Sequence, residues 1–578
     1  MLAMYNLEKS QEQSGFRIKI ALDSQAEHKN VWGRFGLYLR TVRHLRVLQL
    51  LHLIKFRVFS YQTRAKNYDF SIGNLEKECG FSLDGFKIEK SPTNKDLLSF
   101  EKQKQNYWLD HSVSLLDQYS RHYFNELNID NINDIQKISR IKTWLETVET
   151  FSQPGWDAYP LSLRIVNWIK FLRASGNREN EILSSLALQV EHLYQNIEYH
   201  LLGNHLFANA KALVFAGLNF KHKRARRYRK VGFKILKGEL EEQFLTDGGH
   251  FELSPLYHSI ILVDLLDLIA ECRMNHKNLV LAEQEILKTM EEKSIKMHSW
   301  LQTMSHPDGK ISFFNDSNFS HQFSNDDIER YMSVLNIRKY SSEGHTIDLP
   351  ESGLTRLDNK RFVVLFKSSN IQSQYQPGHT HADNLSLELS LAGTRCIVNS
   401  GISTYEKSEQ RDFQRSTSAH SALELNNADS DEVWASFRVG RRSKIVERCF
   451  SDGVDSSKIF ASHDGYSYLP GHPIVSRSIE LCQNHVEVID WVKSAKSYPV
   501  VIRFYLHPQI QVKSVDNGDI HFSQAGIEIL RMISTHELLI SKSKFFPNFK
   551  SECPNTCVSM VIKPSKNIKC VTKFVKCK

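Results

Sequence analysis

The chain has 578 residues, of which 41% are hydrophobic and 24% are charged. This is the composition of a folded globular protein, and the length suffices for two or three domains. Its 74 Lys and Arg residues outnumber its 65 Asp and Glu residues, which gives a formal charge of +9. No recognisable nucleic-acid module accompanies this excess, so we expect no nucleic-acid partner, whereas an acidic partner is allowed.

Basic runs such as KHKRARRYRK at 221–230 have two interpretations. A solvated helix face is the common case, and the binding of an anionic polymer is the other. The sequence leaves both open.

The amino-terminal sequence, MLAMYNLEKSQEQSGFRIKI, does not resemble a secretory signal, because it lacks the basic start, the apolar run and the small-residue cleavage site. No later run approaches the roughly 20 apolar residues that span a bilayer. We therefore expect a soluble protein without a membrane span that, as written, is cytoplasmic.

The chain has nine cysteines, an odd number without pairing signs, so we expect no disulfide framework. Four of them lie near the carboxyl end: Cys553, Cys557, Cys570 and Cys577. A zinc knuckle is an alternative for these four, although their spacing matches no common zinc pattern. A zinc-dependent interaction protein is the corresponding functional alternative.

The hydrophobic period changes along the chain. Residues 1–105 are weakly periodic, and we expect a helical preamble there. Over 106–339 apolar residues recur at helical spacing, as in LSLRIVNWIKFLRAS, which predicts helical hairpins in a bundle, solenoid or toroid. Residues 340–353 are polar and predict a linker. Residues 354–578 read as strands separated by turns, which predicts an antiparallel β domain.

One stretch of the predicted β domain, QPGHTHADNLSLELSLAGTRCIVNSG at 376–401, combines polar groups with a regular alternation. His379, His381 and Asp383 occupy alternate positions, so in a strand they would share one face. The alternating leucines that follow predict a strand with one buried face. We therefore expect the histidines at the mouth of a rigid sheet, where a site is well supported.

A further histidine, His420, follows His381 by 39 positions, and Asn399 lies between them at the end of a predicted strand. Two imidazoles and an oxygen ligand from neighbouring strands form a set that Zn²⁺ accepts. Asp383 would then orient a ligand histidine through its other ring nitrogen.

In the helical half, Asn204 and His205 interrupt an apolar helical pattern, with Asn209 about one turn beyond. A hydrogen-bonded core or capping residue is the usual explanation for any one of them. The pair is only suggestive of a site.

In LTDGGHFELSPLYHSIILVDLL, Ser254 is placed as an N-cap and Pro255 as the first helical residue. Tyr257 would then lie in the first turn, where the helix dipole favours a phenolate and would lower its pKa from about 10. The alternative is an amphipathic tyrosine that covers the helix start. The later element PDGKISFFNDSN, which contains Asp316, is compatible with a plain loop.

The order of five motifs, NHLFANAKAL, DGGHFELSPLYH, PDGKISFFNDS, GHTHADNLSLELSLAGTRCIVNSGISTY and QRSTSAHSAL, resembles the heparinase II/III-like family of bacterial polysaccharide lyases. That family includes heparin and heparan sulfate lyases and is similar to some alginate lyases. The resemblance implies an incomplete (α/α) toroid followed by layered antiparallel β-sheets. It also implies β-elimination on an acidic, uronic-acid-containing polysaccharide.

The resemblance assigns roles to particular residues. Asn204 would hydrogen-bond the substrate carboxylate, His205 and His379 would stabilise charge or act as base, and Tyr257 would transfer protons. It also suggests three residues for sugar subsites: Trp156, Arg164 and Tyr405.

The resemblance further implies one structural zinc held by His381, the residue at 399 and His420. This chain has Asn399 where the family has an aspartate, and a neutral amide is the poorer ligand, so we expect zinc binding to be weak or absent.

Family members that degrade external glycans usually carry a signal peptide. Asn399 and the lack of a signal motivate a rival hypothesis, a non-catalytic or differently catalytic glycan-binding protein of surface-polysaccharide assembly.

Overall fold

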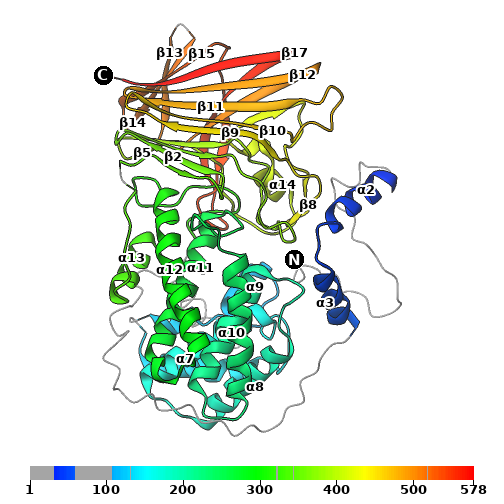
Figure 1. The fold of residues 1–578 in the computed structure, drawn as a ribbon, viewed down its shortest axis with the longest axis vertical. Helices are drawn as coiled ribbons and strands as arrows, with labels where there is room; N and C mark the ends of the chain where they lie inside the picture. Colours follow the sequence, from blue (N-terminus) through cyan, green and yellow to red (C-terminus); the bar gives the residue numbers. More distant parts are fainter. Residues whose placement is uncertain are drawn as a thin grey trace.

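The structure is a computed structural model that describes residues 31–58, 107–129, 132–320, 323–342, 344–516 and 518–577. Figure 1 shows a helical domain at one end of the molecule and a β domain at the other. Most of the expected preamble, 1–105, lies outside the described residues. Two helices fall within it, α2 (Val31–Val42) and α3 (Val47–Val58).

The helical domain consists of antiparallel hairpins, which form the incomplete (α/α) toroid that was predicted. Its helices are α5 (Leu115–Arg121), α6 (Asp134–Thr147), α7 (Ala158–Ser175), α8 (Asn180–Gln195), α9 (Gly203–Asn219), α10 (Ala225–Glu242), α11 (Pro255–Met274), α12 (Leu281–Thr303) and α13 (Asn325–Val334). Helix α9 packs against α7, α10 and α11, and both α9 and α11 are buried along almost their whole length. A helix that is apolar all round belongs in the centre of a domain, and these two form the centre here.

A buried ionic network joins three of these helices. Lys211 of α9 donates to Asp264 at 2.6 Å and to Asp267 at 2.5 Å, both on α11. Lys170 of α7 donates to the second oxygen of Asp267 at 2.5 Å. Because buried charges are costly unless they are paired, this network favours one arrangement of the three helices.

The β domain is built from antiparallel strands around two long ones. Its strands are β1 (Ile347–Leu349), β2 (Leu354–Asp358), β3 (Phe362–Lys367), β4 (Leu387–Leu391), β5 (Thr394–Val398), β6 (Leu423–Leu425), β7 (Val433–Trp434), β8 (Arg438–Val439), β9 (Ile445–Asp452), β10 (Ser456–His463), β11 (Ile474–Cys482), β12 (His485–Leu506), β13 (Gln511–Asp516), β14 (Asp519–Gln524), β15 (Ile527–Ser534), β16 (Leu539–Phe545) and β17 (Cys553–Lys576). The sheet order is β1-β2-β3-β4-β5-β12-β17-β15-β14-β13, and β12 pairs with β17 along most of its length.

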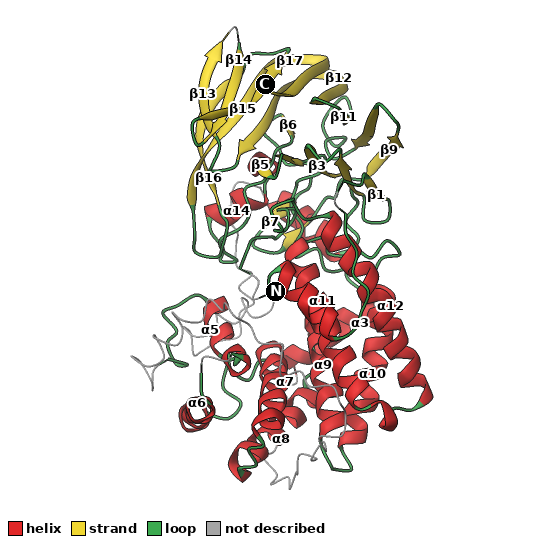
Figure 2. Ribbon diagram, turned by 90° about the vertical axis from the view of Figure 1, so that its left-hand side faces the viewer, coloured by secondary structure: helices red, strands yellow, loops and turns green. Residues whose placement is uncertain are grey.

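The layers of this domain lie above the helices in both views (Figures 1 and 2). A short helix, α14 (Glu409–Arg415), lies on the side of the β domain that faces the toroid. The last toroid helix ends at Val334 and the first strand begins at Ile347, so β1 lies inside the segment 340–353 that we expect to be a linker.

Strand β4 differs from the sequence prediction, because both of its faces are buried. The polar face, which we expected to be exposed, packs against the loop that leaves the toroid. There Glu388 bonds to His306 Nε2 at 2.7 Å and accepts from the backbone N–H groups of Phe313 and Asn399, each at 3.0 Å. Buried polar groups with partners are tolerated, so the alternation marked an interdomain contact and not a solvated face.

The four carboxyl-terminal cysteines do not form a zinc knuckle. They are distributed along and just beyond the extended strand β17. At about 3.3 Å per residue, even Cys553 and Cys557 are about 13 Å apart along the strand, too far to share one tetrahedral ion. Within the described ranges, none of the helices combines the length and apolar content that crossing a bilayer requires.

Candidate active site

The start of α11 carries the first site residue. Ser254 accepts from the backbone N–H of Tyr257 at 3.2 Å, and Pro255 is the first helical residue, so the predicted cap is confirmed. Tyr257 thereby lies in the first turn of α11. Its ring stacks on the imidazole of His379, with 3.7 Å between centroids and 18° between planes. Two residues 122 positions apart in the sequence are thus in contact.

A buried carboxylate holds His379 from behind. Glu252 Oε2 lies 2.6 Å from His379 Nδ1, and burial would raise the Glu252 pKa, but His379 outweighs it and holds that pKa below its usual value. The ionised carboxylate therefore accepts from Nδ1–H, which leaves the imidazole lone pair on Nε2. Glu252 was not among the predicted site residues, and its only signal was its place five residues before Tyr257 in the same motif.

The histidines do not share the face of a strand, contrary to the prediction, because residues 379–386 form a loop before β4. His379 contacts Tyr257 and Glu252, whereas His381 is buried on the β-domain side. A pocket between the domains is lined by residues of the segment that precedes α11, such as Glu252, and of the loop that precedes β4, such as His381.

Tyr405 joins this group. Its hydroxyl lies 2.9 Å from the hydroxyl of Tyr257, and its ring packs near Phe437 and Phe549, with centroids at 5.3 and 5.0 Å. Burial, followed by the Tyr405 hydroxyl, raises the pKa of Tyr257 well above its usual value. The prediction that the helix dipole lowers the pKa of Tyr257 is therefore wrong. Desolvation of the phenolate outweighs a dipole effect worth about 1 kcal/mol.

The start of α9 supplies the remaining pair. Gly203 has a φ of +58°, and a β-carbon there would clash with the side-chain amide of Gln376 from the β domain. The chain therefore passes close to the β domain immediately before Asn204 and His205. The Asn204 side chain is buried, and its Oδ1 has no hydrogen-bond partner. This oxygen is one polar atom that a ligand could satisfy.

His205 is held by its own neighbours. Its Nδ1 lies 3.2 Å from Glu198 Oε1, and its ring packs on Tyr159 with 4.5 Å between centroids. The Glu198 carboxylate also accepts from Asn209, so Asn209 is a buried structural residue. His205 is among the groups that lower the pKa of Glu252. The Asn204–His205 pair therefore shares one electrostatic environment with Glu252 and His379.

The other two subsite candidates have partners inside the toroid. Arg164 is fully buried, donates to Gln189 at 2.8 Å and stacks over Trp144 at 4.2 Å. Trp156 is buried beside Phe151 and Trp144. The structure thus joins Tyr405, but neither Arg164 nor Trp156, to the Tyr257–His379 pair, and their roles in sugar binding stay predictions.

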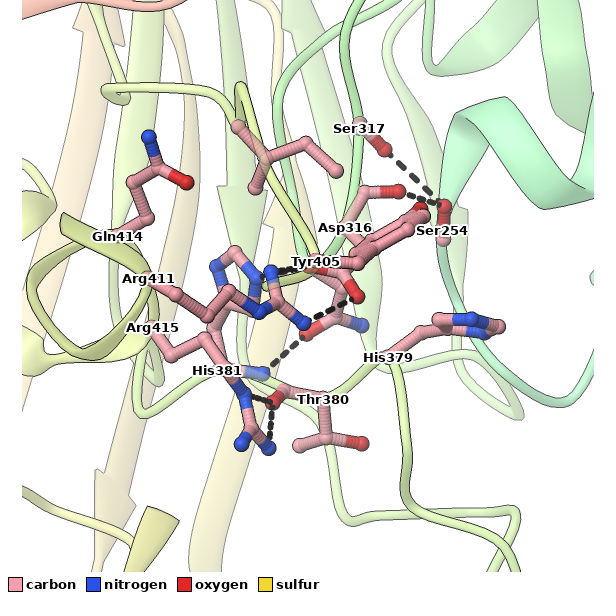
Figure 3. Close-up of polar contacts among 12 residues, drawn as sticks. Ser254, Asp316, Ser317, His379, Thr380, His381, Tyr405, Arg411, Gln414 and Arg415 are labelled. Atoms are coloured by element: carbon pink, nitrogen blue, oxygen red, sulfur yellow. Dashed lines mark hydrogen bonds and ion pairs between the residues drawn. The ribbon is translucent and has the colours of Figure 1, made fainter. Parts of the chain in front are cut away.

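Asp316 fixes the two halves of the site to each other (Figure 3). Arg411 of α14 donates to both its oxygens, at 2.5 and 2.8 Å, and His381 Nε2 lies 2.7 Å away. The Asp316 backbone N–H donates to the His379 carbonyl at 3.0 Å, and the hydroxyl of Ser254 donates to the Asp316 carbonyl at 2.6 Å. One residue therefore touches the cap of the Tyr257 helix and the loop that carries His379.

The carboxylate of Asp316 is ionised. Its burial would raise its pKa, but Arg411 and His381 outweigh this and hold the pKa below its usual value. A second arginine of α14, Arg415, donates through Nε and Nη2 to the Thr380 carbonyl at 3.2 and 3.0 Å. The loop between His379 and His381 is thus held at both ends.

The predicted zinc ligands are close together, but their donor set does not fit the metal. His381 Nδ1 and His420 Nε2 are 3.2 Å apart. Asn399 Oδ1 accepts from the backbone N–H of Ser421 at 3.0 Å, and its Nδ2 is buried without a partner. If the amide were turned over, its NH₂ would face the backbone N–H of Ser421, and two donors would meet. The free end of Asn399 is therefore its NH₂, a donor, which cannot ligate a cation. Two imidazoles alone remain.

Asp383 does not orient a ligand histidine as expected. It pairs with Lys367, whose ammonium also donates to Asn315, and it accepts from the Asn315 backbone N–H at 3.2 Å. Its role is to hold the 313–318 loop against the β domain.

Replacing Asp316 by Asn should destabilise the protein by about 3–5 kcal/mol, because Arg411 would be left buried and unpaired. Urea unfolding measures this difference. The matched control is Asp326→Asn on the exposed face of α13, which should stay within about 0.5 kcal/mol of the parent. Equal unfolding midpoints for the two variants would contradict the anchoring role.

Replacing Asn399 by Asp should create a zinc site, since a carboxylate oxygen would take the place of the Asn399 NH₂. We expect the variant to gain about one zinc per chain over the parent after equilibration with the metal and dialysis, measured by elemental analysis. The gain should disappear when His420 is also changed to Ala. A parent protein that retains as much zinc at this site as the variant would refute the assignment.

Comparisons with known proteins agree with the fold and with the order of motifs. Residues 156–340 match the heparinase II/III N-terminus model, and residues 343–574 match the model described as heparinase II/III-like, C-terminal. A crystal structure of heparinase III aligns over 96% of this chain and 94% of its own, with a TM-score of 0.67 at 16% identity. A chondroitin AC lyase from Streptomyces coelicolor aligns over 85% and 80%, with a TM-score of 0.51 at 10% identity.

Curated relatives match a smaller part of the chain. A heparin-sulfate lyase of Pedobacter heparinus is 28% identical over 43% of this chain and 39% of its own length. One from Bacteroides stercoris is 28% identical over 41% of this chain and 37% of its own length. The matched region therefore spans less than half of each of these relatives. Because the two family models together cover most of the chain, from 156 to 574, the chain belongs to the heparinase II/III family.

Proposed function

We propose that this protein is a polysaccharide lyase that cleaves a uronic-acid-containing glycosaminoglycan by β-elimination. The observation that carries the proposal is the stacked pair of Tyr257 and His379, with Glu252 behind the imidazole. The matches to heparin-sulfate lyases support the substrate class.

β-Elimination makes three demands on a site. The uronate carboxylate must be neutralised so that the C5 proton becomes acidic, a base must remove that proton, and an acid must protonate the departing O4. In this chain Asn204 and His205 would bind the carboxylate. The Asn204 side chain is buried, and no hydrogen bond of the protein holds its Oδ1. The amide can therefore turn so that its NH₂ donates to a carboxylate oxygen.

His379 is suited to the base and Tyr257 to the acid. The hydrogen bond to Glu252 keeps the proton on Nδ1, so Nε2 can accept the C5 proton, and the carboxylate then stabilises the imidazolium. Tyr257 has a raised pKa and is a neutral phenol near pH 7. It can donate its proton to O4, with the Tyr405 hydroxyl 2.9 Å away to hydrogen-bond the phenolate that forms.

A purely glycan-binding role explains less of this arrangement. Binding needs hydrogen bonds and aromatic faces, but it does not need a carboxylate that fixes the tautomer of one imidazole against a phenol. The Glu252–His379–Tyr257 set therefore favours catalysis over the rival hypothesis.

Replacing Tyr257 by Phe should lower kcat by about 10²–10⁴-fold, since it removes the acid and leaves the ring stack. The assay is the ultraviolet absorbance of the 4,5-unsaturated uronate on heparan sulfate, heparin, hyaluronan and chondroitin sulfate. Replacing Tyr199, which lies on the toroid beside α3, by Phe should change kcat little. No absorbance from the parent on any of these glycans would refute the proposal.

Replacing Glu252 by Gln should lower kcat by about 10²-fold or more while KM changes little. The reason is that a glutamine NH₂ directed at Nδ1 would favour the tautomer with the proton on Nε2, which cannot act as base. Glu241→Gln on the exposed face of α10 removes the same charge and should leave both constants unchanged. An unchanged kcat in the Glu252 variant would exclude the positioning role.

A further inference from the structure

Helices α2 and α3 connect the two domains beside the site. Figure 1 shows α2 next to the β7–β8 side of the β domain and α3 next to the toroid, near α9. On the β-domain side, Arg40 donates to Glu432 at 2.8 Å through two nitrogens, and the indole N–H of Trp434 donates to Thr41 at 3.1 Å. These contacts fix α2.

The toroid side is held by a second set of contacts. Arg46 pairs with Glu242 and lies over the Tyr375 ring at 4.0 Å, and the His52 ring packs on Tyr199 with 5.0 Å between centroids. Tyr199 lies in the short loop, 196–202, that leads to Asn204. Burial lowers the pKa of the next residue, His200, to about 4, and both His205 and His52 contribute to that lowering. Helix α3 therefore borders the His205 side of the site.

The turn between α2 and α3 brings Arg43 and His44 to Arg442 of the β domain. Arg43 Nε donates to His44 Nε2 at 3.1 Å. Burial, followed by the charges of Arg442 and Arg43, lowers the pKa of His44 to about 4. The bonds of Arg40 to Glu432 and of Trp434 to Thr41 hold this turn beside the segment that carries Arg442. We call the three basic side chains there the Arg43–Arg442 cluster (Arg43, His44 and Arg442).

Within the described part of the chain, neither Arg43 nor Arg442 forms an ion pair with a carboxylate. Arg442 Nη1 donates to the Gln374 carbonyl at 2.7 Å, and its Nε is buried without a partner. The carboxylate of Asp431 favours the charged form of Arg442, but its oxygens accept from Ser443 and not from the guanidinium. By contrast, Arg40 and Arg46 on either side each have a glutamate partner.

The cluster is connected to the site through one loop. Gln374, which accepts from Arg442, lies two residues before Gln376, whose amide packs on Gly203 at the start of α9. His379 follows three residues later. A polymer held at Tyr257 and His379 would thus continue along this loop towards unpaired positive charge.

We propose that Arg43, His44 and Arg442 form an anion subsite for an acidic group, sulfate or carboxylate, on a sugar beyond the uronate at the catalytic pair. This rests on the proposed function. Guanidinium groups match the geometry of both anions, and an arginine with unused donors gains most from such a partner. The region matched by the family models begins at 156, so Arg43 and His44 lie outside it. The subsite depends on the α2–α3 segment of this chain.

The test measures binding separately from cleavage, with every protein carrying Tyr257→Phe to prevent turnover. Arg43→Gln with Arg442→Gln is compared with Arg226→Gln and Arg227→Gln, which remove the same charge from the exposed face of α10. The probes are a heparan sulfate oligosaccharide and an unsulfated heparosan oligosaccharide of equal length, titrated by calorimetry. We expect the cluster variant to lose about tenfold or more in affinity for heparan sulfate at low salt, with no loss in the control.

The heparosan titration identifies the group that is recognised. An equal loss on heparosan assigns a carboxylate, and a loss confined to heparan sulfate assigns a sulfate. Affinities equal to those of the control on both probes would overturn the subsite, as would a parent that binds neither. Arg43→Gln alone, at an exposed turn, repeats the test if the double variant does not fold. A protein that binds through the cluster but produces no unsaturated uronate would sink the proposed function and leave the subsite standing.

Discussion

The ion pair between Asp316 and Arg411 is the constraint on which the site depends. Its two members come from different domains, and neither carboxylate nor guanidinium is exposed. A charge in that position is tolerated only when its partner is in place, so the pair fixes the toroid loop against the β domain. The backbone of Asp316 then bonds to the His379 carbonyl and to the cap residue Ser254. The stack of Tyr257 on His379 follows from these contacts.

The same principle accounts for the polar character of the interface between the domains. Glu388 with His306, Lys367 with Asp383 and Arg415 with the Thr380 carbonyl are all buried pairs across or beside it. An apolar interface would stabilise association equally well, but it would allow the two surfaces to slide. Directional hydrogen bonds specify one register, and the stack of Tyr257 on His379 requires such a register, because its two rings come from different domains.

Asn399 changes the donor set of the three predicted zinc ligands, because the other two are the histidines His381 and His420. The two histidines, His381 and His420, face each other at a hydrogen-bond distance, and His381 is also tied to Asp316. The loop is thus held by hydrogen bonds and an ion pair between side chains.

The sequence by itself determined the class of fold, the order of its domains and the local structure around Tyr257. These follow from short-range rules: hydrophobic period separates helices from strands, and Ser254 followed by Pro255 is a helix start wherever it occurs. The motif order was also sufficient for the family, and it singled out Tyr257 and His379, which the structure brings into contact. What these residues do together was not readable from spacing, because the stack of Tyr257 on His379 joins residues 122 positions apart.

Only the tertiary structure decided the partners and the protonation states. Glu252 behind His379, Arg411 on Asp316 and the Arg43–Arg442 cluster each join segments whose separation carries no sequence signal. The polar face of β4 is buried and the pKa of Tyr257 is raised, whereas the sequence predicted the opposite for both, and the reason is the same. Burial depends on what packs against a residue from elsewhere in the chain, and desolvation is larger than the local dipole and alternation effects that sequence reasoning can use.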